Sequence, residues 1–210
     1  MPPTARPDAT ATATAPAAPH WLRTWGPTLL FLLLLALART SFANHYVVPS
    51  GSMQPTLEPG DRLFVDMRAY GLRIPFTDIT SADAPTPRRG DIVVFRSPAD
   101  GTRLVKRVVA VGGDRVSLRD GRLSVDGVAL ALPGGGERIG SRAVALDLGD
   151  GGGPDIATVV VPDGQLLVLG DHRGASADGR VFGFIDARAP YARGVGIFWR
   201  SGEGPTWRAL

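Results

Sequence analysis

The stretch RLVKRVVAV, residues 103–111, contains four valines in nine positions. β-branched residues favour strands, in which successive side chains point to opposite faces. Lys106 therefore shares one face of the predicted strand with Leu104 and Val108. If that face packs against the core, loss of hydration lowers the pKa of the Lys106 ammonium group from about 10.4. The stretch predicts a strand carrying a candidate base, and an edge-strand lysine in water is the alternative.

Short runs of the same kind recur through the rest of the chain from residue 45 onward. They are bounded by Gly, Asp and Pro, which favour turns. The other predicted strands cover residues 62–66, 91–96, 115–119, 122–126, 158–161, 166–169 and 195–199. Asp120-Gly121 lies between two of them and is typical of a hairpin turn. Because no sustained helical period is present, we expect a mainly β fold, either a barrel or packed antiparallel sheets.

The composition of the 210 residues excludes several classes of function. The chain has no cysteine, so it has no disulfide, no thiolate metal site and no thiol nucleophile. Its 23 basic and 20 acidic side chains leave a net charge of +3, and the arginines are scattered, so we expect no nucleic-acid partner. Lys106 is the only lysine. Unlike arginine, lysine can lose its proton, which makes it a candidate base.

The first 42 residues differ from the rest in composition. Residues 1–20 are almost entirely Ala, Pro and Thr and predict a disordered tail. Residues 25–38 are apolar except for one threonine, and as a helix they would measure about 21 Å, against about 30 Å for a hydrocarbon core. Two interpretations stay open: a signal peptide cleaved near the Ala-Leu-Ala triplet at 36–38, or an uncleaved transmembrane anchor over 21–42. Either interpretation places residues 43–210, the predicted β domain, outside the cytoplasm.

Two insertions interrupt the pattern of predicted strands. Residues 70–89 contain several prolines and predict a loop. Residues 134–153 contain eight glycines in twenty positions. We expect this Gly-rich segment to be flexible and exposed.

The segment VVPSGSMQPTL, residues 47–57, supplies a candidate nucleophile. An extended run enters Pro49, small residues follow, and a second proline comes next, so Ser52 lies in a constrained turn. The glycine before it allows close approach of a substrate, and the Ser52 amide and the Ser50 hydroxyl can both point at a developing oxyanion. A serine nucleophile needs a base beside it, and a neutral lysine can serve. Taken alone, a Ser-Gly-Ser sequence is more often a polar turn.

Five blocks of sequence, taken together, resemble the type I signal peptidases, which are membrane-anchored serine/lysine leader peptidases. They occur in the family's order, from the nucleophile box through the lysine box to a C-terminal box. The blocks are PSGSMQPTL at 49–57, Gly60-Asp61, RGDIVVF at 89–95, VKRVVAVGGD at 105–114 and GDHRGASADGR at 170–180. Only the N-terminal tail and the Gly-rich segment lie outside the resemblance.

The resemblance implies a role for each residue of these blocks. Ser52 would be the nucleophile, Lys106 the general base and later the acid for the leaving amine, and Ser50 the side-chain oxyanion donor beside the Ser52 amide. Ser176 would form a hydrogen bond with Lys106 and so orient the Lys106 lone pair. The remaining assignments are an ion pair of Asp178 with Arg180, structural positions at Asp171 and Arg173, and substrate-pocket positions at Met53 and Leu57.

The chain departs from the commonest family pattern at two positions of the C-terminal box. His172 stands where asparagine is usual, and Gly179 stands where serine is usual. His172 is also the one serious candidate for a Ser/His/Asp arrangement, in which a histidine replaces Lys106 as the base. No group of His, Asp and Glu has metal-ligand spacing, and no glycine-rich segment has the context of a phosphate loop.

The resemblance implies a single-pass membrane serine endopeptidase with its mainly β, signal-peptidase-like domain behind one N-terminal transmembrane helix, on the periplasmic side of the inner membrane. It would remove signal peptides from secretory preproteins after A-x-A sites, without a metal or an organic cofactor. The lipid bilayer would be a second partner. The aromatic residues of Ile197-Phe198-Trp199 and Trp207 favour core packing, above all Ile197 and Trp199 at alternate positions, and an apolar surface that rests on the bilayer is the alternative. Two alternatives stay open: a specialised maturation peptidase with the same dyad, for instance for conjugative pilins, or a non-catalytic membrane-anchored module that binds peptides.

Overall fold

The computed structural model describes residues 21, 23–32, 43–71 and 85–210. The chain divides into two compact units, Met1–Leu37 and Ala38–Leu210. In the first unit residues 23–32 are helical, and the apolar side chains from Leu29 to Leu32 are exposed. No helix within these described residues is long and apolar enough to span a bilayer. The predicted tail at 1–20, the Ala-Leu-Ala triplet, the second half of the predicted anchor and most of the 70–89 loop lie outside the described residues.

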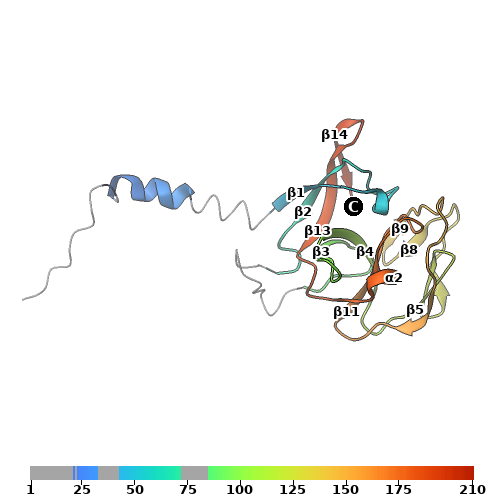
Figure 1. Cartoon of the computed structure of the whole chain (residues 1–210). Coiled ribbons are helices and arrows are strands. Elements are labelled where there is room, and N and C mark those ends of the chain that lie inside the picture. Colours follow the sequence, from blue (N-terminus) through green and yellow to red (C-terminus); the bar gives the residue numbers. More distant parts are fainter. Residues whose placement is uncertain (1–20, 22, 33–42, 72–84) are drawn as a thin grey trace, which may run out of the picture. The chain divides into compact units, whose positions relative to one another are not determined.

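The second unit is built on an eight-stranded antiparallel sheet (Figure 1). The strand order is β1-β2-β13-β3-β4-β11-β12, with β14 paired to β13. Their bounds are β1 (Ala43–Val47), β2 (Arg62–Asp66), β3 (Ile92–Arg96), β4 (Arg103–Val111), β11 (Gln165–Leu169), β12 (Ile185–Asp186), β13 (Ala192–Arg200) and β14 (Gly204–Ala209). Because β1 and β12 stand at opposite ends of this order, the sheet formed by the described strands is open. The prediction of packed antiparallel sheets is confirmed, and the barrel alternative is wrong.

Two smaller antiparallel sheets complete this unit. One has the order β10-β5-β6-β7, and the other is the pair β8-β9. Their bounds are β5 (Arg115–Arg119), β6 (Arg122–Val125), β7 (Val128–Ala129), β8 (Glu137–Ile139), β9 (Arg142–Val144) and β10 (Ile156–Val160). The turn between β5 and β6 has φ of 49° at Asp120 and 73° at Gly121, the left-handed pair that a two-residue hairpin turn requires. The predicted hairpin is therefore confirmed.

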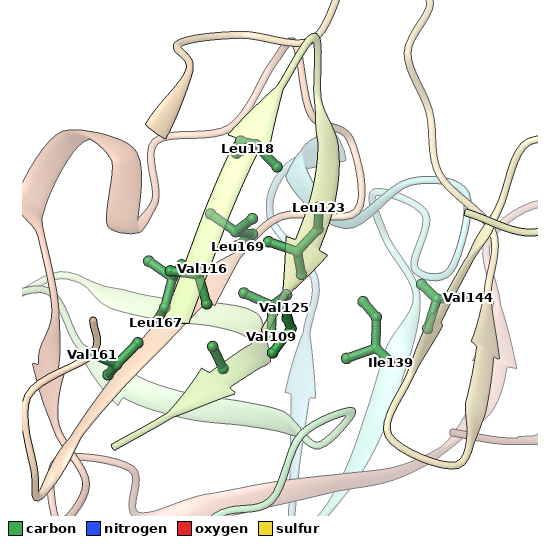
Figure 2. Packing of buried hydrophobic residues seen from close by; sticks show 11 residues of the cluster. Val109, Val116, Leu118, Leu123, Val125, Ile139, Val144, Val161, Leu167 and Leu169 are labelled. Atoms are coloured by element: carbon green, nitrogen blue, oxygen red, sulfur yellow. The ribbon is translucent and has the colours of Figure 1, made fainter. Parts of the chain in front are cut away.

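A hydrophobic core joins the large sheet to the smaller ones (Figure 2). Val109 of β4 and Leu169 of β11 pack with side chains of β5 and β6, and the cluster also takes in Ile139 of β8 and Val144 of β9. The expectation that the Gly-rich segment 134–153 is exposed holds for most of its residues but is wrong for Glu137, Ile139 and Val144, which are buried. These three lie on β8 and β9, which contribute apolar side chains to the core.

Two short helical elements lie beside the central strands. The 3₁₀ turn η1 (Gly51–Met53) follows β1, and the helix α2 (Gly179–Phe182) follows β11. α2 begins at Asp178, whose carboxylate accepts a hydrogen bond from the Arg180 backbone N–H as an N-cap. The η1 turn thus lies against β4, and α2 lies against β11.

Candidate active site

Lys106 and Ser52 meet where β4 passes the η1 turn. The Lys106 Nζ atom lies 2.6 Å from the Ser52 Oγ atom. Lys106 is 2% exposed, whereas Ser52 is half-buried and reachable from solvent. The alternation of β4 therefore directs Lys106 inward, and the edge-strand alternative does not hold.

Burial controls the protonation of Lys106. Loss of hydration lowers its pKa from the ordinary value of 10.5 to about 8, although the carboxylates of Asp178 and Asp171 oppose the shift. The cation of Arg180 adds to the lowering. Near neutral pH a useful fraction of the Lys106 side chains is therefore an amine whose lone pair can accept the proton of a serine hydroxyl.

Ser50 and the Ser52 hydroxyl lie on the same side of the turn. The Ser50 hydroxyl donates to Ser52 Oγ over 3.4 Å, a long hydrogen bond, and Ser50 is exposed. A hydroxyl on this open side can turn from the nucleophile toward an oxygen of a bound substrate.

Ser176 lies beside the nucleophile turn, packed against Gly170. An added Cβ at Gly170 would collide with the Ser176 Oγ and with the Ser52 carbonyl oxygen, so only glycine allows the two segments to approach this closely. The Ser176 Oγ is buried, and its hydroxyl helps to lower the pKa of the neighbouring Asp178 carboxylate. Ser176 is thus close to both the nucleophile turn and the Asp178 carboxylate.

Asp178 and Arg180 form the ion pair that the resemblance implied. Both side chains are fully buried, with Arg180 Nε 2.8 Å from Asp178 Oδ1. Burial by itself would raise the pKa of Asp178, but hydrogen bonds from Arg180 and from the Gly170 N–H outweigh it and lower the pKa. The Gly170 contact ties this ion pair to the end of β11, next to the site.

A second buried ion pair joins three of the resembling blocks. Arg107, which follows Lys106 on β4, donates to both carboxylate oxygens of Asp171 at 2.9 and 2.7 Å. The Thr56 hydroxyl donates to the same carboxylate over 2.5 Å. Sequence reasoning assigned Asp171 a structural position but missed Arg107 and Thr56. Both residues lie inside blocks that resemble the family, Arg107 in the lysine box and Thr56 in the nucleophile box. That position was the only sequence signal that could have indicated their role.

Arg173 is fully buried and bonds to the Gly-rich segment. It donates to Glu137 Oε2 over 2.8 Å and to the carbonyl oxygens of Gly170 and Gly121 over 3.0 and 2.7 Å. Glu137 is also fully buried and accepts from the Leu123 N–H. No sequence signal singled out Glu137, because it lies in a segment that was expected to be exposed.

His172 contacts the nucleophile turn through its backbone and through Gly51, not through the Ser52 hydroxyl. Its backbone N–H donates to the Ser52 carbonyl oxygen over 3.3 Å. Ring atom Nδ1 lies 3.3 Å from the Gly51 carbonyl oxygen, and Nε2 lies 2.9 Å from Asp150 Oδ2. Among the described residues neither ring nitrogen forms a hydrogen bond with the Ser52 hydroxyl, so His172 is not placed as the base for Ser52.

A cavity of about 640 Å³ opens beside the Lys106–Ser52 pair. It runs between β1 and the first half of β4, and apolar side chains make up much of its wall. The lining residues are His45, Tyr46, Val47, Val48, Pro49, Ser50, Ser52, Met53, Arg103, Leu104, Val105, Lys106, Ala175 and Ala177. Met53 thus lies at the cavity as expected, whereas Leu57 is fully buried in the core cluster next to it and is not part of the lining.

The chain is similar to known proteins over most of its length. The family described as "Signal peptidase, peptidase S26" matches residues 21–199. A curated relative, the probable signal peptidase I-2 of Synechocystis sp., is 33% identical over 187 residues, which cover 85% of this chain and 73% of the relative. The signal peptidase I of Pseudomonas aeruginosa is 35% identical over 172 residues, which cover 73% of this chain but 59% of the longer relative. Among solved structures, a crystal structure of a signal peptidase I from Enterococcus faecalis matches with 27% identity and a TM-score of 0.38, covering 58% of this chain and 97% of that one.

Proposed function

Because the chain belongs to the peptidase S26 family of signal peptidases, a family of serine endopeptidases, we propose that it removes signal peptides from secretory preproteins. Ser52 is the nucleophile and Lys106 the general base. The observation that carries the proposal is the 2.6 Å separation of Lys106 Nζ and Ser52 Oγ at the wall of an open cavity. A buried amine with a pKa of about 8 beside a solvent-reachable hydroxyl is suited to acyl transfer.

The proposed reaction proceeds in two acyl-transfer steps. Neutral Lys106 takes the proton from the Ser52 hydroxyl, and the oxygen attacks the carbonyl carbon of the scissile peptide bond. The Ser52 N–H and the Ser50 hydroxyl stabilise the oxyanion of the tetrahedral intermediate. Protonated Lys106 then gives its proton to the leaving amine of the mature protein. A water molecule, deprotonated by Lys106, hydrolyses the acyl-enzyme and releases the signal peptide.

Substrate binding by strand addition fits the pairing of the two strands that flank the cavity. β1 pairs with β2 only, so its other edge is unpaired among the described strands. β11 pairs with β4 only from Arg107 to Val111, which leaves residues 103–106 paired to β3 alone. Both free edges border the cavity. An extended segment of substrate between them would gain main-chain hydrogen bonds and lead its scissile bond to Ser52.

Small residues before the cleavage site fit the apolar wall of this cavity. Met53 is 1% exposed and lines the cavity together with Ser52. An alanine methyl group of the substrate would pack against this apolar side chain. We therefore assign the A-x-A preference to the wall formed by Met53 and its apolar neighbours.

Ser176 has the proposed role of orienting Lys106. Its hydroxyl is buried, and it packs against Gly170 at the Ser52 carbonyl. A hydrogen bond from an N–H of the neutral amine to the Ser176 oxygen would direct the Lys106 lone pair toward Ser52 Oγ. The buried Asp178–Arg180 pair supports this role, since it fixes the turn that carries Ser176.

The proposed location is the inner membrane, with residues 43–210 on the periplasmic side and residues 21–42 as the anchor. The exposed apolar helix at 23–32 supports an anchor. The ectodomain also exposes Trp199, and Trp207 in contact with Phe64, and these aromatic side chains are suited to the lipid interface. Contact there would bring the site close to membrane-bound preproteins.

The test is cleavage of a preprotein with an A-x-A site by the full-length protein in detergent, with the product termini read by mass spectrometry. Wild type is compared with Ser52→Ala, Lys106→Arg and Lys106→Met, and Ser124→Ala on β6 serves as the control serine. We expect cleavage after the site by wild type and Ser124→Ala only, because arginine keeps the charge but does not act as a base. Equal cleavage by Lys106→Arg would disprove the lysine mechanism, and no cleavage by wild type would disprove signal-peptide removal at such sites.

A further inference from the structure

Two side chains touch across the cavity at a distance from the Lys106–Ser52 pair. β1 and β4 both approach this pair as their residue numbers increase, and they line the cavity with residues 45–48 and 103–106. Tyr46 and Arg103 therefore lie toward the end of the cavity that is remote from Ser52. The Arg103 guanidinium carbon is 4.3 Å from the centroid of the Tyr46 ring, a cation–π contact that joins the two strands.

The contact with Tyr46 leaves N–H groups of Arg103 available to a ligand. A guanidinium group stacks on an aromatic ring through its face, whereas its five N–H donors lie in its plane. Burial raises the pKa of the Tyr191 hydroxyl, and the charge of Arg103 and a hydrogen bond with it oppose this rise. Because Arg103 is exposed, the donors that are not used at Tyr191 can be reached from the cavity.

The described part of the chain does not neutralise the charge of Arg103. No carboxylate of the described residues forms an ion pair with it. Asp100, the acidic residue closest to it along the chain, bonds to Thr102 instead. Arg96 stands directly opposite Arg103 in the pairing of β3 with β4, and like charges at such positions destabilise a sheet. A bound anionic group would offset this repulsion.

The spacing along β4 indicates which part of a substrate reaches Arg103. Arg103 precedes Lys106 by three residues, which is about 10 Å along a strand. An extended substrate covers the same distance in three residues. With the residue before the scissile bond beside Lys106, the fourth residue before that bond lies beside Arg103, and the long arginine side chain also reaches the fifth. Both positions lie outside the A-x-A site, which uses the first and third.

We propose that Arg103, stacked on Tyr46, is a specificity-determining residue that selects substrates with an acidic side chain at the fourth or fifth position before the cleaved bond. This inference rests on the proposed function and adds a charge preference to it. A carboxylate at that place accepts two parallel hydrogen bonds from the edge of the guanidinium group. A lysine at the same place is repelled by Arg103 and by Arg96 behind it.

The first arm of the experiment measures cleavage of two peptide series by the full-length protein in detergent. Each peptide has an A-x-A site, with Glu, Gln or Lys at the fourth position in one series and at the fifth in the other. In at least one series we expect kcat/KM to be about threefold to tenfold higher for Glu than for Gln, and lowest for Lys. The difference should lie in KM and shrink between about 0.05 M and about 0.5 M salt. Equal values for Glu and Gln in both series would overturn the proposal.

Substitutions at Arg103 show whether this residue causes the preference. Arg103→Gln should remove the preference for Glu over Gln, and Arg103→Glu should reverse it, so that Lys becomes the best of the three. Arg119→Glu is the matched control, because Arg119 is an exposed arginine of β5 outside the cavity lining and the change in net charge is the same. A preference that persists in Arg103→Gln, or that Arg119→Glu also reverses, would overturn the proposal.

The second arm does not depend on catalysis. Fluorescence anisotropy measures the affinity of Ser52→Ala, with and without Arg103→Gln, for labelled versions of the same peptides. We expect the Glu peptide to bind about threefold to tenfold more tightly than the Gln peptide only when Arg103 is present. If wild type cleaves none of the peptides, the proposed function fails, and the ratio of affinities still decides whether Arg103 selects an acidic side chain. Equal affinities would overturn the proposal.

Discussion

The Lys106 Nζ atom contacts the Ser52 Oγ atom at 2.6 Å across 54 positions of sequence. Neither residue is reactive alone at neutral pH, since a free lysine is protonated and a free serine hydroxyl is not a strong nucleophile. The strand β4 removes Lys106 from water, and η1 places Ser52 at the surface of the same cavity. This pairing of a buried amine with an accessible hydroxyl is the basis of the predictions below.

Activity should rise with pH through the titration of Lys106. The base works in its neutral form, and burial lowers its pKa to about 8. We expect kcat/KM to increase about tenfold per pH unit below this value and to level off above it. Initial rates of preprotein cleavage across this range check the prediction. A rise centred near pH 6.5, the ordinary range of a histidine, would contradict it.

Lys106→Met should abolish cleavage and stabilise the fold at neutral pH. Below about pH 8 the lysine is charged in both the folded and the unfolded chain, so the folded protein bears the full desolvation cost. The printed shift of 10.5 to about 8 corresponds to at most about 3 kcal/mol. The wild-type free energy of unfolding rises between these two pH values, as the folded state loses its proton first. The difference from Lys106→Met should therefore shrink by pH 10.5.

Urea unfolding, followed by tryptophan fluorescence at neutral pH and at pH 10.5, measures the difference in stability between Lys106→Met and wild type. Lys106→Arg is the control, because it keeps a buried cation and should not be stabilised. Equal stability of Lys106→Met and wild type at neutral pH would mean that the amine is not desolvated.

Glu137→Gln should destabilise the protein, because it leaves the guanidinium of Arg173 buried without a counter-charge. Both side chains are fully buried in wild type. Breaking such a pair by removing one partner costs about 3–5 kcal/mol. The matched control is Glu203→Gln, whose pair with Arg208 is exposed and should contribute less than about 1 kcal/mol. The denaturant concentrations at the unfolding midpoints of the two variants test this prediction. Equal midpoints for Glu137→Gln and Glu203→Gln would contradict it.

Gly170→Ala should reduce cleavage strongly. The added methyl group collides with the Ser176 Oγ and with the Ser52 carbonyl oxygen, so the nucleophile turn must move. A displacement of about 1 Å at a reacting group can lower the rate about a hundredfold. Gly26→Ala is the control, since an added Cβ there has no neighbour within 4 Å. Preprotein cleavage rates of both variants provide the measurement, and a wild-type rate for Gly170→Ala would refute the close packing.

The hairpin and most strands of the ectodomain were predictable from local pattern. β2, β4 and β5 begin and end at the predicted residues, because their alternation and turn residues are encoded within each segment. The weaker elements were not predictable in this way. β1, β12 and β14 were missed, since each is stabilised by pairing with a neighbouring strand of the sheet and not by its own composition.

The Gly-rich segment shows most clearly what local sequence patterns do not predict. Its composition favours turns, and composition alone does not reveal that Ile139 and Val144 complete a core shared with β4 and β11. Likewise, the partner of Arg173 is a glutamate 36 positions away, and no local pattern indicates such a pairing. Long-range burial, not propensity, determines both contacts.

The sequence by itself determined the mainly β fold class, the family and the identity of the two residues proposed to react, because periodicity, turn chemistry and short motifs are local properties of the chain. Only the tertiary structure decided that Lys106 is desolvated, that Ser52 lies 2.6 Å from it and that His172 faces Asp150 and Gly51 rather than the nucleophile. The physical reason is that hydration and hydrogen-bond geometry depend on which distant segments pack together. Those contacts exist only once the strands have paired.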